Sequence, residues 1–369
     1  MTRWLNFLVA AWLAGNIPAA ANAQDPARVH DIPTQICRDY FFVPITLSEQ
    51  PGRPDDRTLW FVYDTGASSS IMDPDSLERV TGQVFDAGQR VSIRDATLGP
   101  VTYNRLPTRL RELDHLSMAL GREIDGILAY DSFGDFLVTL DYQAGQIRLE
   151  AGELPRPDGI TVFDTDGPDS RPWLEIGFPG RTRRMLIDSG AGGTVLAVNG
   201  LHRYDTVTAP RPTGASMRIN RIERRQGARL NGLARLGPHT LSAPVLQSTP
   251  GTELIGGVVM RHFRWTFDAD RERVRIERVT EGDISFDPMI AHGMVLRADG
   301  DGLRVEGVLE QTPAADAGVL EGDLVTHFNG LPMRDRNCDP DGTRTELVLT
   351  LLRDGQVMDL ALALYPLVD

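Results

Sequence analysis

Apolar residues along most of this chain come in short runs that end at glycine, proline, asparagine or aspartate. Two such runs are Trp60-Phe61-Val62-Tyr63 and Met185-Leu186-Ile187. Short apolar runs bounded by turn residues are typical of buried strands rather than helices. The 36 glycines and 24 prolines supply the turns between them. We therefore predict a mainly β fold.

Two stretches of the chain carry the same landmarks in the same order. In each, an apolar strand ends at an aspartate, and an apolar element, a further strand and a closing aspartate follow. Asp141 lies 77 residues after Asp64, and Asp268 lies 80 residues after Asp188. Near-equal spacing over this length indicates a duplicated β unit. The predicted units are lobe one, a Pro- and Gly-rich linker and lobe two, at residues 39–150, 151–171 and 172–278.

The two aspartates sit in turns of a particular composition, Asp64-Thr65-Gly66-Ala67 and Asp188-Ser189-Gly190-Ala191. The glycines allow a sharp turn and a close approach between the two turns, and the hydroxyls can bond across to the opposite turn. Two carboxyl groups held together cannot both ionise easily, so they share a proton. One can then activate water while the other protonates a carbonyl oxygen.

These doubled turns, each followed by an apolar element, resemble the aspartic proteases of the pepsin and retropepsin type. Ala67 and Ala191 are more like retropepsins, since pepsins carry a hydroxyl residue there. The resemblance implies a two-lobed acid-protease β-barrel fold and endopeptidase activity on polypeptides, with no cofactor and no metal. It implies a catalytic dyad of Asp64 and Asp188, supported by Thr65, Gly66, Ser189 and Gly190.

Proteases of this type close a β-hairpin over the substrate, so we expect hairpins at residues 91–105 and 217–236. Tyr103 is either an aromatic of that flap or an ordinary strand residue. The sequence has no His-Glu-x-x-His, no Gly-x-Ser-x-Gly and no phosphate-binding glycine loop. The alternative function is a catalytically inactive peptide-binding or scaffold protein that keeps the same lobes.

Residues 290–369 follow a different pattern. A strand at 302–308 precedes a short helix from Thr312 to Gly318, and a strand at 324–328 ends in Asn329-Gly330. This order resembles a small PDZ domain of bacterial proteases, which implies that the C-terminal end of a peptide adds as a strand beside the first of these strands. The implied peptide-binding residues are Gly302, Leu303, Arg304 and Val305. A purely structural or regulatory block is the alternative, because residues 335–343 are short and polar where that family has a helix.

The N-terminus has the order of a secretory signal. Arg3 precedes an apolar run, and small residues follow it up to Ala23. Asn16 and Pro18 interrupt the run too early for a membrane span. We therefore predict a cleaved signal peptide at residues 1–23 and a protein exported to the periplasm or secreted, without a membrane span.

Charge and cysteine content narrow the choice of partners. A formal net charge of −13 disfavours nucleic acid and anionic membrane surfaces. The two cysteines, Cys37 and Cys338, enter an oxidising compartment if the chain is exported. They form either one disulfide or two separate thiols, and spacing does not decide between these.

Overall fold

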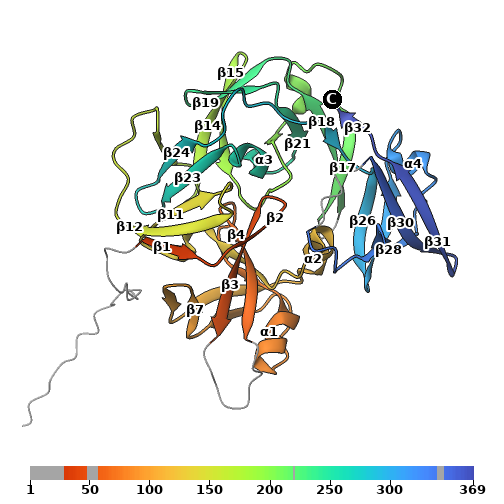
Figure 1. Ribbon diagram of the computed structural model, residues 1–369, viewed down its shortest axis with the longest axis horizontal. Helices are drawn as coiled ribbons and strands as arrows, with labels where there is room; N and C mark the ends of the chain where they lie inside the picture. The colour runs from red at the N-terminus through yellow and green to blue at the C-terminus, as the bar shows by residue number, and fades with distance from the viewer. Residues whose placement is uncertain (1–28, 48–56, 219–220, 339–344) are drawn as a thin grey trace, which may run out of the picture.

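The computed structural model describes residues 29–47, 57–218, 221–338 and 345–369 (Figure 1). The predicted signal peptide lies outside them. The mainly β fold is confirmed, because strands grouped in curled sheets are the main secondary structure and the helices are short. Among the described residues, no helix has the length and apolar character needed to cross a membrane.

The sheet of lobe one carries Asp64 at the end of a central strand. Strand β4 (Thr58–Asp64) lies between β3 (Tyr40–Leu47) and β10 (Gly126–Ala129). β10 runs parallel to β4 and antiparallel to β5 (Ile71–Met72) on its other side. A Cβ atom at Gly126 would lie 2.2 Å from the ring of Phe61, so this close approach of the strands requires glycine.

Lobe two repeats this arrangement around the second acidic turn. β22 (Leu254–Ile255) runs parallel to β15 (Arg181–Ile187), the strand that leads into Asp188, and antiparallel to β16 (Leu196–Val198). β14 (Trp173–Phe178) pairs with the other edge of β15. The strand before each aspartate therefore packs beside the same type of returning apolar strand.

A six-stranded sheet joins the two lobes. At its centre β11 (Phe136–Asp141) pairs antiparallel with β23 (Phe263–Asp268), and the Thr139 and Thr266 hydroxyls lie 2.9 Å apart. The outer strands are β12 (Gln146–Ala151) and β1 (Val29–Ile32) on one side, and β24 (Arg273–Arg278) and β13 (Val162–Asp164) on the other. β1 precedes the predicted start of lobe one and β13 falls in the predicted linker, so both segments are structured parts of the fold.

The other elements complete the two lobes. Around lobe one these are β2 (Gln35–Cys37), α1 (Pro74–Thr81), β6 (Arg90–Ile93), β7 (Ala96–Leu98), β8 (Val101–Tyr103), β9 (Leu106–Leu110), α2 (Asp114–Leu120) and the 3₁₀ helix η1 (Tyr130–Phe133). In lobe two they are η2 (Leu201–Arg203), β17 (Arg211–Arg218), β18 (Arg221–Arg229), β19 (Leu233–Leu236), β20 (His239–Ser242), β21 (Val245–Ser248) and α3 (Gly257–Met260).

The segment at 91–105 does not form one hairpin over the acidic turns. β6 pairs with β9, whereas β7 and β8 pair with each other, and β7 also joins the end of β3 far from Asp64. The tip packs on the six-stranded sheet, because a Cβ atom at Gly99 would lie 3.0 Å from Ile32. Tyr103 is buried in the core. The expected flap is therefore wrong for this segment.

The hairpin of lobe two starts earlier than predicted. β17 and β18 pair from Arg211 opposite Gly227 to Arg218 opposite Arg221, rather than over residues 217–236. The predicted range instead takes in part of this hairpin, β19 and the link between them. β17 lies along the C-terminal block, against β26 (Met294–Asp299) and β32 (Pro366–Val368) (Figure 1).

The C-terminal block folds around its own sheet, in the order β26, β27 (Gly302–Val308), β28 (Leu324–Phe328), β30 (Glu346–Arg353) and β31 (Gln356–Ala363). Short β29 (Leu331–Pro332) pairs with β28, and β25 (Met289–Ile290) pairs with β32. The predicted short helix is α4 (Pro313–Asp316). Thr312 precedes it, but the hydroxyl donates to the Leu309 carbonyl instead of capping the helix.

The peptide groove expected beside Gly302, Leu303, Arg304 and Val305 is corrected by this pairing. β26 occupies one edge of β27 along its length. The other edge pairs with β28 at Leu303 and Arg304, and Val305 bonds with the loop at Gly322 and Asp323. Strand addition needs unpaired backbone groups, so it cannot occur beside these residues. The terminal strand on this side of the sheet is β26.

The C-terminal block is not a separate folding unit. Cys37 and Cys338 form a disulfide with 5.4 Å between their Cα atoms, which decides the alternative left open by the sequence. Met118 of α2, in lobe one, is fully buried in the core of the block. Arg336, only 2% exposed, donates to the carbonyls of Met118 and Ala119 at the end of that helix. Lobe one therefore completes and anchors the block.

Candidate active site

The two acidic turns meet at the junction of the lobes. Asp64 ends β4 and Asp188 follows β15, and each carboxyl group faces the glycine of the opposite turn. A Cβ atom at Gly66 would lie 2.6 Å from Asp188 Cγ, and one at Gly190 would lie 2.3 Å from Asp64 Cγ. Any side chain at either glycine would displace a carboxylate. The structure thus brings together all four of these predicted site residues.

Thr65 and Ser189 lock the turns together. The Thr65 hydroxyl donates to the Ile187 carbonyl at 2.7 Å, and the Ser189 hydroxyl donates to the Tyr63 carbonyl at 2.9 Å. Each hydroxyl also accepts from the backbone amide of the other residue, at 2.9 Å and 3.0 Å. Both side chains are fully buried, so none of these bonds competes with water.

The elements beneath both turns bond in the same way. The Tyr130 amide donates to the Ala67 carbonyl at 3.2 Å, and the Gly257 amide donates to the Ala191 carbonyl at 3.1 Å. Ala129, which stands where the resembled family has glycine, is buried, and its amide donates to the Ser70 hydroxyl. The alanine is therefore accommodated without loss of the support under the first turn.

The surroundings of the pair favour a shared proton. Burial raises the pKa of Asp64, opposed by hydrogen bonds from the amides of Gly66, Ala67 and Gly190 and by a bond with Asp188. Burial raises the pKa of Asp188 well above its ordinary value, and the Asp64 charge and the bond between the two carboxyls raise it further. Because the groups titrate as a pair, one proton is retained between them.

One neighbour of the dyad was not predicted from the sequence. Tyr40, at the start of β3, is packed so closely on the loop after Asp188 that a Cβ atom at Gly192 would lie 2.6 Å from its ring. Burial, and then the Asp188 charge, raise the pKa of Tyr40. The preceding Asp39 lies 3.6 Å from Arg261 of lobe two. The turn between β2 and β3, next to the disulfide at Cys37, thus adjoins the site.

A second unpredicted neighbour comes from the predicted linker. Arg171 Nη1 donates to the Gly66 carbonyl at 2.8 Å, so a guanidinium group lies directly on the first acidic turn. Its charge lowers the pKa of Asp188. An acid, a base and a tryptophan stand in alternate positions, Asp169, Arg171 and Trp173, where the chain enters the first strand of lobe two. That pattern is the signal that could have identified the residue.

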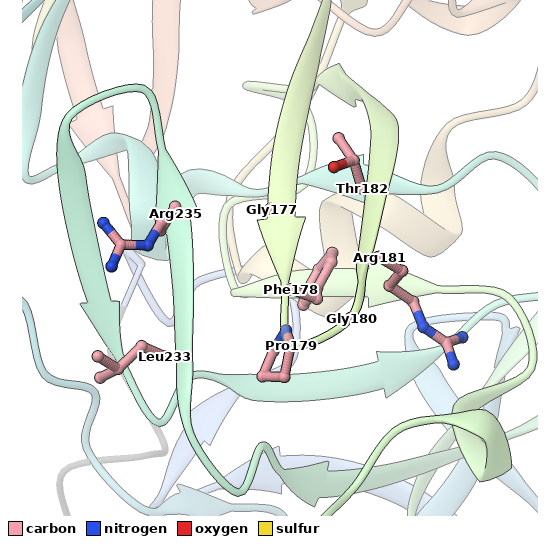
Figure 2. Close-up of a pocket in the computed structure, with 8 residues that line it drawn as sticks. All are labelled: Gly177, Phe178, Pro179, Gly180, Arg181, Thr182, Leu233 and Arg235. Atoms are coloured by element: carbon pink, nitrogen blue, oxygen red, sulfur yellow. The ribbon is translucent and has the colours of Figure 1, made fainter.

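A hollow of about 620 Å³ lies away from the dyad. It is formed between the β14–β15 turn and β19 (Figure 2). Its lining residues are Gly177, Phe178, Pro179, Gly180, Arg181, Thr182, Leu233 and Arg235. It contains no carboxylate and neither aspartate of the dyad. Across the part of the chain that the structure describes, no three His, Cys, Asp or Glu side chains come together as a metal site.

Comparisons with known proteins add little to this geometry. No model of a known protein family matches the sequence, and no curated protein matches it. Among solved structures, a PDZ domain protein from Parabacteroides distasonis is similar, with 13% identity and a TM-score of 0.20. That match covers 22% of this chain and 21% of the other. It spans about a fifth of either protein and establishes neither fold nor function.

Proposed function

We propose that the protein is an aspartic endopeptidase of the pepsin and retropepsin type that hydrolyses peptide bonds with Asp64 and Asp188. The observation that carries this proposal is the mutual approach of the two acidic turns, in which each glycine adjoins the opposite carboxyl group. The crossed hydrogen bonds of Thr65 and Ser189 fix that approach. Two buried carboxyl groups that titrate as a pair and share one proton can serve as an acid and a base.

In the proposed reaction, ionised Asp64 removes a proton from water as the water oxygen attacks the carbonyl carbon of the peptide bond. Protonated Asp188 donates its proton to the carbonyl oxygen, so a neutral tetrahedral diol forms. Proton transfer from Asp64 to the amide nitrogen and return of a diol proton to Asp188 then break the carbon–nitrogen bond. The dyad returns to its starting state with one shared proton, and no covalent enzyme intermediate forms.

The proposed role of the C-terminal PDZ-like block is recruitment or regulation of polypeptides. Its sheet ends at β26, which is the strand where an extended peptide could add. β17 and α2 of the lobes lie against β26, so a peptide that binds there has to compete with them. Binding at this edge would therefore be coupled to the position of the lobe-two hairpin.

We also propose that the chain acts outside the cytoplasm, in the periplasm or the medium. The signal-like N-terminal segment supports export. The Cys37–Cys338 bond supports it as well, since structural disulfides persist in oxidising compartments.

A peptide library digested across the acid and neutral range tests the proposed function. We expect internal cleavage that is blocked by a peptide analogue with a hydroxyl-bearing tetrahedral carbon in place of the scissile carbonyl. Absence of both cleavage and inhibitor binding by folded protein would contradict the proposal and favour the inactive peptide-binding alternative.

A further inference from the structure

Arg171 is hydrogen-bonded to Gly66, the residue whose amide orients the Asp64 carboxylate. Its Nη1 atom donates to the Gly66 carbonyl at 2.8 Å, while the Gly66 amide donates to Asp64 Oδ1 at 2.7 Å. The Gly66 carbonyl therefore accepts a hydrogen bond from the Arg171 cation, while the Gly66 amide holds the Asp64 carboxylate. A charge-assisted hydrogen bond of this kind is stronger than one between neutral groups.

The guanidinium is itself held in place. Asp169 accepts from Arg171 Nε at 3.1 Å and from Nη2 at 2.6 Å, and its Oδ1 also accepts from Trp173 Nε1 at 3.0 Å. The Arg171 side chain is only 19% exposed. The Arg171 hydrogen bond, together with that of Trp173, lowers the pKa of Asp169 to about 2. The ion pair thus stays intact in mildly acidic solution.

The position of the cation has an electrostatic consequence for the dyad. A positive charge on the Gly66 carbonyl polarises the peptide group between Gly66 and Ala67, so the Ala67 amide becomes a stronger donor. That amide donates to the Asp64 backbone carbonyl at 3.1 Å, and it lies close enough to the carboxyl group to lower the pKa of Asp64. Ala67 has no hydroxyl that could stabilise the Asp64 carboxylate, and the polarised amide stabilises it instead. Stabilisation of an ionised carboxylate lowers the pH at which it forms.

We propose that Arg171 is a positioning residue of the dyad, which holds the first acidic turn and stabilises its ionised form so that hydrolysis extends to lower pH. This inference rests on the proposed function. Asp169 and Trp173 are its supports, and none of the three is placed to act on the peptide bond itself.

Other groups around the dyad do not replace this cation. Three tyrosines lie near the charge of the dyad. Burial raises the pKa values of all three, so they are neutral in acid: Tyr40, Tyr63 and Tyr142. Burial raises the pKa of Asp39, and the charge of Arg261, 3.6 Å away, only partly opposes that rise. The charge of Arg38, in the same turn as Asp39, lowers the pKa of Tyr40. The charge of Asp131 raises the pKa of Tyr63. Arg171 is the cation that acts on Asp188.

The pH profile of kcat/KM tests the inference. Arg171→Met should move both limbs to higher pH by about 0.5 to 1 unit, since a nearby positive charge lowers carboxyl pKa values by about that amount or more. Arg171→Lys, which keeps the charge, should restore part of the shift, and Asp169→Asn should give a smaller shift in the same direction. The matched control is Arg184→Met, which removes an arginine that pairs with Asp166 on the same linker and should leave the profile unchanged.

A titration that needs no activity separates this inference from the proposed function. The carboxyl ¹³C resonances of labelled aspartates, assigned with Asp64→Asn and Asp188→Asn, should titrate at higher pH in Arg171→Met than in the parent chain. If the parent chain cleaves nothing, this titration still decides the role of Arg171. Unchanged titration and unchanged limbs in folded Arg171→Met, or an equal shift in Arg184→Met, would overturn it. If Arg171→Met fails to fold, Asp169→Asn decides, and an unchanged titration with unchanged limbs in that folded variant would overturn the inference.

Discussion

Thr65 and Ser189, 124 residues apart in the chain, each receive a hydrogen bond from the other's backbone amide. Each hydroxyl then donates to a carbonyl of the opposite strand, at Ile187 and Tyr63. The four bonds are buried and cross the junction of the lobes. Because they fix the two turns that carry Asp64 and Asp188, they set the separation of the carboxyl groups.

Thr65→Val should therefore destabilise the protein and misplace the dyad. The variant leaves the Ile187 carbonyl and the Ser189 amide buried without partners, at a cost of about 2 to 4 kcal/mol in the free energy of unfolding. Ser189→Ala should behave alike, and the double variant should lose less than the sum because the residues share one network. Thr46→Val, at an exposed threonine pair with Thr58, is the control. Equal stability of Thr65→Val and Thr46→Val in denaturant unfolding would refute this role.

Asp188→Asn should stabilise the fold at neutral pH. Burial raises the pKa of Asp188 well above its unfolded value, so the folded chain binds more protons than the unfolded chain. Its contribution to stability is complete below the unfolded pKa and is lost as pH rises toward the folded pKa. The Tm advantage of Asp188→Asn over the parent should therefore be larger at pH 7 than at pH 4. Asp135→Asn, at an exposed acid, controls for the substitution, and an advantage that is absent or largest at pH 4 would argue against a proton held at the dyad.

Loss of the Cys37–Cys338 bond should lower stability strongly, because it closes 301 residues of chain. Replacement of both cysteines by serine should cost about 2 to 5 kcal/mol in the free energy of unfolding. Reductant should lower the Tm of the parent chain and leave that of the double-serine variant unchanged. A parent chain indifferent to reductant would show that the bond does not contribute.

Much of the fold and the dyad could be predicted because their signals are local. Asp64-Thr65-Gly66 and Asp188-Ser189-Gly190 are contiguous, and the duplication places them in register. The hairpin predicted at 91–105 does not form, because β7 pairs with β3, which precedes it by about 50 residues, and β8 pairs with β7.

The remaining errors share this non-local origin. The alternation of Asp169, Arg171 and Trp173 marks Arg171 in the sequence, but only the fold shows that it contacts Gly66. Likewise, the dependence of the C-terminal block on lobe one is visible only in the structure, through the contacts of Met118 and Arg336. Removal of residues 290–369 would therefore cut a shared core and a disulfide, and Leu303→Asp would place a charge in that core, since Leu303 is 5% exposed.

The most direct test of the central claim compares the parent chain with Asp64→Asn and Asp188→Asn in cleavage of one identified peptide substrate. Each variant should lose about 10³-fold or more in kcat, and the double variant should lose little beyond that, because both acids serve one proton-sharing step. The parent profile should be bell-shaped with its maximum in mild acid, and all variants should show cooperative thermal unfolding. Near-parental turnover by either folded variant would contradict the assignment of Asp64 and Asp188 as the catalytic pair.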